Sequence, residues 1–139
     1  MTIYNREDAR TVLPQLEKRL QDYIVEQGSK GIWTYRKWNS GIAECWGVYS
    51  YSTSVSSVWA SPIYVSTMAD AQPYPFKFKE IPMEWASVES SENACWLYKE
   101  SSGHNTTTHT ASYRPLKVNS FSSSTQTFEI RYYVKGTWK

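Results

Sequence analysis

The sequence has few of the residues on which common catalytic sites depend. Its 139 residues include only two cysteines, two histidines and six glycines. It contains no Gly-rich phosphate loop, no dinucleotide fingerprint and no Gly-x-Ser-x-Gly elbow, so the signatures of nucleotide binding and serine nucleophiles are missing. His104 and His109 lie five residues apart, without the Cys or carboxylate cluster that would complete a zinc site. We therefore predict no enzymatic activity, no metal and no cofactor.

Long apolar runs and an excess of one charge are also absent. No segment approaches the roughly 20 apolar residues that span a bilayer, and the N-terminus has neither region of a secretory signal. The formal net charge is only +2 and the basic residues are scattered, which argues against nucleic-acid binding. We expect a chain made in the cytoplasm, without membrane insertion or a nucleic-acid partner. Cys45 and Cys95 are then expected to be free thiols, with a disulfide as the alternative.

Aromatic residues, by contrast, are abundant, at 16% of the chain. Aromatic and β-branched residues favour strands, and Ser and Thr fill the segments between them. The length suits one domain with a single core. Roughly eight short strands, without a second amphipathic helix to cross over, favour a mainly β fold, an antiparallel β-sandwich or jelly-roll. The sequence does not choose between these two topologies.

The N-terminal segment is the one stretch with helical periodicity. Apolar residues recur there at spacings of three and four, which predicts an amphipathic helix that ends near Gln27, before Gly28. We therefore divide the chain into a helical stem, residues 1–28, and a β head, residues 29–139. A helix this short is marginal in water, so its stripe must pack on its own head or on copies of itself in a coiled coil. The stripe consists of Leu13, Leu16, Leu20, Tyr23 and Ile24.

The clearest local prediction is a β-hairpin. Strands over 33–38 and 42–51 flank a three-residue loop that ends in Gly41, and this loop fits a type I turn closed by a left-handed residue. Arg36 and Glu44 then face each other as an opposite-charge pair that fixes the register. The predicted pairs are Trp38 with Ile42, Arg36 with Glu44, and Thr34 with Trp46.

Strands are also predicted further along the chain. Apolar and polar residues alternate over 128–134, which predicts a half-buried strand near the middle of a sheet. The run Phe76 to Lys79 alternates too, and the prolines before it predict an edge strand. The other predicted strands span 62–67, 83–88, 94–99 and 112–119, and polar loops are expected over 52–57, 101–110 and 120–125.

The residues expected to bind a ligand are aromatic or lie in polar loops. Tyr and Trp rings can stack on sugars while polar side chains bond hydroxyl groups, although each tryptophan has a core position as its alternative. The expected binding residues are Trp33, Tyr49, Tyr51, Trp59, His104, Asn105 and His109. A glycan-active enzyme would instead need two carboxylates, which could come from Glu44, Glu80, Glu84, Glu89, Glu92, Glu100 and Glu129.

Residues 33–47 carry a more specific pattern, W-x-Y-R-K-W-x-x-G-x-A-E-C-W-G. This run, with the segment before it, resembles a helix and hairpin found in structural proteins of phages and prophages from Gram-positive gut bacteria. The resemblance implies a tail- or head-fibre protein of the virion. It further implies a homotrimer that contacts other tail or capsid proteins and binds the host surface, with the surface polysaccharide as a candidate ligand. The alternative is a stand-alone, monomeric, lectin-like domain that binds carbohydrate.

Overall fold

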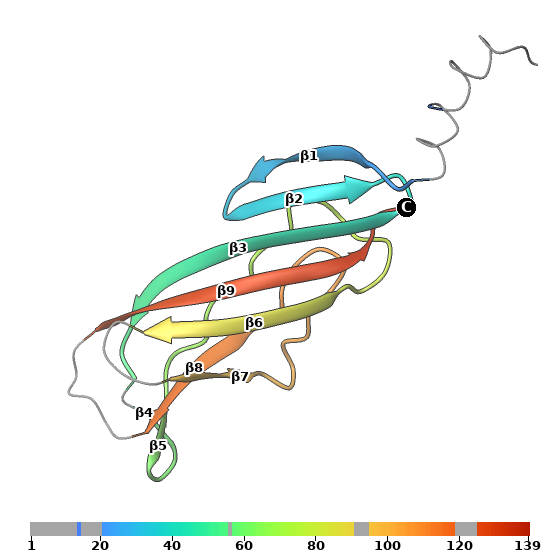
Figure 1. Cartoon of the computed structure of the whole chain (residues 1–139). Coiled ribbons are helices and arrows are strands. Elements are labelled where there is room, and N and C mark those ends of the chain that lie inside the picture. The colour runs from blue at the N-terminus through green and yellow to red at the C-terminus, as the bar shows by residue number, and fades with distance from the viewer. Residues whose placement is uncertain (1–13, 15–20, 56, 91–94, 119–124) are drawn as a thin grey trace, which may run out of the picture.

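The structure is a computed structural model that describes residues 14, 21–55, 57–90, 95–118 and 125–139. Its strands are β1 (Ile24–Lys30), β2 (Trp33–Trp38), β3 (Ile42–Thr53), β4 (Ser57–Ala60), β5 (Ile63–Val65), β6 (Met83–Ser90), β7 (Trp96–Lys99), β8 (Tyr113–Val118) and β9 (Gln126–Thr137). They form a five-stranded sheet, β1-β2-β3-β9-β6, and a four-stranded sheet, β4-β5-β8-β7 (Figure 1). Every strand pair is antiparallel. The prediction of a mainly β, antiparallel fold is confirmed.

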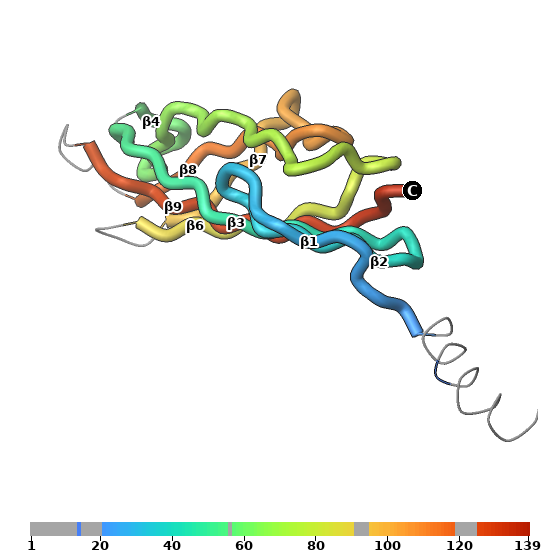
Figure 2. The backbone as a smooth tube through the Cα atoms, turned by 90° about the horizontal axis from the view of Figure 1, so that it is seen from above, coloured from blue at the N-terminus to red at the C-terminus, as the bar shows by residue number. Residues whose placement is uncertain are grey.

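The two sheets lie in separate layers (Figure 2) and enclose a common core. Alternate residues of β9 are buried on the inner face of the five-stranded sheet, and β9 lies between β3 and β6, as its alternation predicted. The second layer adds Tyr113 from β8, and two aromatic residues from the long segment between β5 and β6. The buried cluster comprises Trp33, Ala43, Cys45, Ala69, Tyr74, Phe78, Ala111, Tyr113, Ile130, Tyr132 and Val134.

The hairpin of β2 and β3 forms in the predicted register. Arg36 lies opposite Glu44, and Thr34 lies opposite Trp46. Gly41 has φ of +99° and its N–H donates to the Trp38 carbonyl at 3.0 Å, so the loop closes on a residue with positive φ. The Arg36 and Glu44 side chains are 3.9 Å apart and Arg36 is 44% exposed. Such a pair marks the register but adds little free energy.

Most of the expected N-terminal helix lies outside the described residues; residue 14 is helical, but the predicted end of the helix is a strand. Residues 24–27, which should have finished the helix, begin β1, whose Ile24 lies opposite Trp38 and whose Lys30 lies opposite Trp33. The stem boundary at residue 28 therefore falls within a strand of the head. The physical reason is the ladder of backbone hydrogen bonds that β1 forms with β2, which outweighs a local helical spacing.

The seam predicted along that helix is wrong for the two members that the structure describes. Ile24 belongs to β1, and the Tyr23 carbonyl accepts a hydrogen bond from the Asn39 N–H at 2.9 Å, which ties it to the β2–β3 turn. Both residues therefore lie at the margin of the sheet. The remaining members of the seam, Leu13, Leu16 and Leu20, lie outside the described residues.

The edge strand predicted over 76–79 is also wrong. The segment joins no ladder, although the Phe78 N–H donates to the Thr107 carbonyl at 2.9 Å and the Lys79 N–H donates to the Thr137 carbonyl at 2.8 Å. Phe78 is fully buried, and its ring centroid lies 4.7 Å from that of Phe76. Burial of aromatic rings therefore fixes this segment, which crosses the core as an irregular chain.

Candidate functional site

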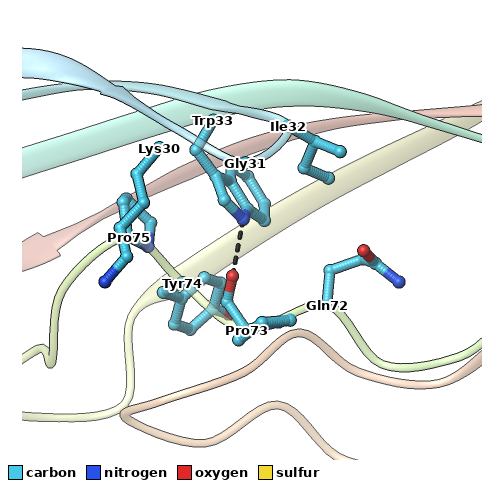
Figure 3. A pocket seen from close by; sticks show the side chains of 8 residues that line it. All are labelled: Lys30, Gly31, Ile32, Trp33, Gln72, Pro73, Tyr74 and Pro75. Carbon is cyan, nitrogen blue, oxygen red and sulfur yellow. Dashed lines mark hydrogen bonds between the residues drawn. The ribbon is translucent and has the colours of Figure 1, made fainter.

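A cavity of about 430 Å³ opens beside the turn between β1 and β2 (Figure 3). Two chain segments line it, Lys30–Trp33 from the turn and Gln72–Pro75 from the segment between β5 and β6. Its volume falls in the range of small-molecule sites. The cavity therefore joins parts of the chain that are about 40 residues apart in sequence, as the bond between Trp33 and Pro73 shows.

Two glycines shape the wall formed by the turn. Gly31 has φ of +60°, a left-handed conformation that other L-residues adopt only at a cost. Gly47 of β3 lies against the turn, where a Cβ would lie 2.2 Å from the Ile32 carbonyl oxygen. A side chain at residue 47 would therefore displace the turn. Gly47 is the last residue of the hairpin pattern, so this contact gives it a physical role.

Trp33 forms the inner wall of the cavity. It is only 3% exposed, and its indole N–H donates to the Pro73 carbonyl at 2.6 Å. Its ring meets that of Tyr74 edge-on, with centroids 5.7 Å apart. The prediction of Trp33 as an exposed stacking residue is wrong, and the core position that the sequence left open is the one observed. The hydrogen bond nevertheless fixes one wall of the cavity to the other.

The opposite wall is anchored by the segment before β8. The Gln72 carbonyl accepts from the Thr110 N–H at 2.9 Å, and the Gln72 N–H donates to Thr110 Oγ1 at 2.8 Å. The Tyr74 N–H donates to the Thr108 carbonyl at 2.8 Å. The Gln72 side chain is also held, because its Nε2 donates to the Asp70 carbonyl at 2.9 Å. The cavity is therefore a rigid, preformed feature.

A carboxylate of β6 holds Tyr74, one of the residues that line the cavity. Glu84 accepts hydrogen bonds from the Tyr74 hydroxyl at 2.6 Å, the Tyr113 hydroxyl at 2.7 Å and the Ala111 N–H at 3.1 Å. Burial, followed by the bond to Glu84, raises the pKa of Tyr74 and of Tyr113 well above its usual value. Glu84 was named only as one of seven carboxylates that a glycan-active enzyme could use, although it alternates in step with Ala86 and Val88, which could have indicated that it faces the core.

A second, smaller cleft of about 170 Å³ lies on the four-stranded sheet and contains Trp59. Trp59 is 53% exposed, as its expected binding role requires, and its ring centroid lies 5.6 Å from that of Tyr98. Arg114 Nε and Glu100 Oε2 form an ion pair of 3.0 Å at the same cleft. Tyr98 and Arg114 were not predicted as site residues, and Glu100 was named only among the carboxylates that a glycan-active enzyme could use.

The other predicted binding residues have structural contacts or lie apart. Tyr49 and Tyr51 stack on each other with centroids 5.6 Å apart and pack against the core. Asn105 Nδ2 donates to the Pro82 carbonyl at 2.9 Å, and His109 Nδ1 lies 3.0 Å from Thr106 Oγ1. His104 is exposed. The seven predicted residues therefore do not form one site.

The outer face of the five-stranded sheet carries an exposed aromatic row. Trp46, Tyr133 and Trp85 occupy adjacent positions across β3, β9 and β6, and we call them the outer aromatic row. Trp85 is 49% exposed and its ring centroid lies 5.6 Å from that of Tyr133. The Arg36 guanidinium lies 5.1 Å from the centre of the Trp46 ring. Exposed aromatic surface of this kind marks interaction sites.

The cysteines and histidines show no sign of chemistry in the part of the chain that the structure describes. Cys45 and Cys95 are both free, and burial raises the pKa of Cys45 to about 12, which suits an inert thiol. No three side chains of His, Cys, Asp or Glu gather there as a set of metal ligands. Within the same residues, no helix has the length and apolarity needed to cross a membrane.

The comparisons with known proteins concern the fold. No family model matches the chain, and no curated protein matches its sequence. A C-terminal fragment of the R1 pyocin fibre of P. aeruginosa is similar in structure, with a TM-score of 0.53 and 13% identity over 96% of this chain and 32% of that one. An N-truncated R1-type pyocin tail fibre has a TM-score of 0.55 and 12% identity, over 98% of this chain and 99% of that one. The chain thus spans about a third of the first structure and nearly all of the second, and its β fold is like that of tail fibres.

Proposed function

We propose that this protein is a structural module of a bacteriophage tail or fibre that is part of the virion and binds the host surface as a homotrimer. The observation that carries the proposal is the similarity in fold to two pyocin tail-fibre structures over almost the whole chain. The hairpin pattern of residues 33–47 supports it independently, because that resemblance rests on side chains rather than on the backbone. The proposed role is binding and assembly, without catalysis.

A homotrimer suits this role because copies on one axis bind a repetitive surface with avidity even when each site is weak. The surface that best fits a contact between copies is the outer aromatic row, which lies on the long strands of the five-stranded sheet. Charges of both signs flank it, with Arg131 and Glu89 3.2 Å apart on the same face. Such a face can meet a second copy without net repulsion.

Light scattering after size exclusion, at several concentrations of the full chain, tests the assembly. We expect the mass of a trimer, and we expect the double variant Trp85→Ser, Tyr133→Ser to dissociate. Val58→Ser is the matched control, because Val58 is 60% exposed but lies on the other sheet. A wild-type chain that remains monomeric at every concentration would contradict the trimer, and an unchanged mass of the double variant would contradict the contact surface.

The second candidate function is a stand-alone lectin-like domain, and the Trp59 cleft favours it. An exposed indole beside a half-exposed ion pair can cover the apolar face of a sugar while the ion pair bonds its hydroxyl groups. A monomer whose binding to a glycan array is lost on Trp59→Ala, with unchanged circular dichroism, would favour this function. Trp96→Ala is the control, since Trp96 is exposed but does not line the cleft.

A further inference from the structure

We infer that the cavity beside the β1–β2 turn binds an anionic saccharide, a mono- or disaccharide that carries a carboxylate or a phosphate group. The inference rests on the proposed binding to a host surface and specifies the chemistry of the ligand. Sequence analysis assigned no binding role to Lys30 or Gln72, and the comparisons assign none to either residue.

The charge of the cavity has one sign. Among the eight lining residues, Lys30 is a cation and no residue is a carboxylate. Lys30 is exposed and makes no ion pair with any described residue, whereas Lys37 on the neighbouring strand is paired with Glu26 at 2.9 Å. An uncompensated ammonium group beside apolar walls attracts an anion more strongly than a paired one does.

The walls match the apolar face of a sugar ring. Pro73 and Ile32 present C–H surface, and the buried Pro75 and Trp33 close the inner side. Apolar walls with a few well-placed polar groups are typical of small-molecule sites. No wall is an exposed aromatic face, because Trp33 is buried. The cavity therefore encloses a ligand from the sides.

The polar groups lie at opposite sides of the cavity. Lys30 extends beside Pro75, and Gln72 lies on the other side of the Trp33 indole (Figure 3). Since Nε2 of Gln72 is bonded to the Asp70 carbonyl, its Oε1 is oriented, and no described residue donates to it. Oε1 can therefore accept a bond from a sugar hydroxyl while Lys30 binds the charged substituent. This separation would orient the ligand.

The site is organised before any ligand enters. The 2.6 Å bond from Trp33 to Pro73 joins the two walls, and Thr110 holds both backbone groups of Gln72. Binding to a rigid site costs less ordering entropy than binding to one that must close. The Trp59 cleft differs in charge, because its Arg114 is already paired with Glu100, so it suits a neutral sugar better.

Calorimetric titration of the full chain with glucuronic acid, glucose 6-phosphate and glucose tests the inference at low salt. We expect at least one anionic sugar to bind about tenfold or more tightly than glucose, and we expect added salt to weaken that preference. Lys30→Gln should lower the affinity for the anionic sugars to that for glucose, while Lys30→Arg should keep the preference for the anionic sugars. Lys99→Gln is the control, since Lys99 is exposed on β7 and does not line the cavity.

The two anionic sugars distinguish the kind of charged group. Tighter binding of glucuronic acid would indicate a carboxylate-bearing glycan, and tighter binding of glucose 6-phosphate would indicate a phosphate-bearing glycan. Equal affinity for glucose and both anions, or a preference that survives Lys30→Gln, would overturn the inference. Absence of binding by all three sugars would overturn it too. The proposed trimer would not be affected, because light scattering tests it separately. If the protein is a monomer and its preference for anionic sugars depends on Lys30, the binding site is supported and the trimer is contradicted.

Discussion

The two layers of the protein are stabilised by different kinds of interaction. In the five-stranded sheet, β3 and β9 pair along 12 residues each, in a ladder without a register shift. The strands of the four-stranded sheet have only three to six residues. The irregular segments beside it depend on single hydrogen bonds, many of them from side chains. A single side chain on the outer face of the first layer is therefore expected to matter little for stability, whereas a side chain that holds the second layer in place is expected to matter much.

The largest expected effect comes from a variant that removes the hydrogen bonds between the two layers. Glu84→Ala removes the acceptor of three donors, two of them tyrosine hydroxyls of the second layer, and we expect a loss of about 4 kcal/mol in the free energy of unfolding. Urea denaturation measures it. Glu89→Ala, on the exposed face of the same strand, is the control and should cost about 0.5 kcal/mol or less. Equal losses for the two variants would contradict the comparison.

The second prediction concerns the turn that builds the cavity. Gly47→Ala places a methyl group against the Ile32 carbonyl and should cost about 2–3 kcal/mol, because the ladder must shift to admit it. Gly31→Ala meets open space and should cost only about 1 kcal/mol, the strain of a positive φ. Thermal unfolding of the two variants separates steric overlap from backbone strain. The reverse order of stability would be inconsistent with the contact between residues 32 and 47.

The third prediction concerns alkaline pH. The raised pKa values of Tyr74 and Tyr113 mean that the folded state keeps these protons at a pH where the unfolded state, with a tyrosine pKa of about 10, loses them. Stability is therefore complete below about pH 10 and falls as pH rises above it. Urea denaturation between about pH 8 and pH 11 should show this fall. Tyr113→Phe should make it shallower, and an unchanged slope would contradict a contribution from Tyr113.

The smallest expected effect lies within the long ladder. Arg36 and Glu44 face each other 3.9 Å apart at the surface, and a double-mutant cycle with Arg36→Ala and Glu44→Ala should give a coupling below about 1 kcal/mol. The cycle also cancels the separate bond that the Tyr133 hydroxyl donates to Glu44. A coupling above about 2 kcal/mol would mean that side-chain pairs stabilise this layer as strongly as the other.

The parts of the fold that the sequence predicted are those with local causes. The β2–β3 hairpin follows from a short loop with a terminal glycine, and β9 follows from alternation over successive residues. The segment 24–30 was misassigned because its pairing with β2 is a tertiary contact that the spacing of its own residues does not reveal. The alternation at 76–79 was misleading because no strand is available to pair with it.

The candidate sites were less predictable, for a related reason. Trp33 and Trp59 have similar sequence surroundings, yet one is buried and the other is half exposed. The cavity depends on the approach of residues 30–33 to residues 72–75, and the Trp59 cleft depends on residues from four strands or their ends. Composition left the aromatic residues open between core and surface, and only the tertiary structure determines which rings are accessible and which charges are unpaired.

The position of β9 has a consequence for how the protein is made. Residues 126–137 are synthesised after both of their sheet neighbours, yet they lie between them. Until the ribosome has released this strand, β3 and β6 each expose an unpaired edge to other nascent chains. Final assembly of the sheet therefore waits for a strand that is made after the other four, and such non-local pairing is slow.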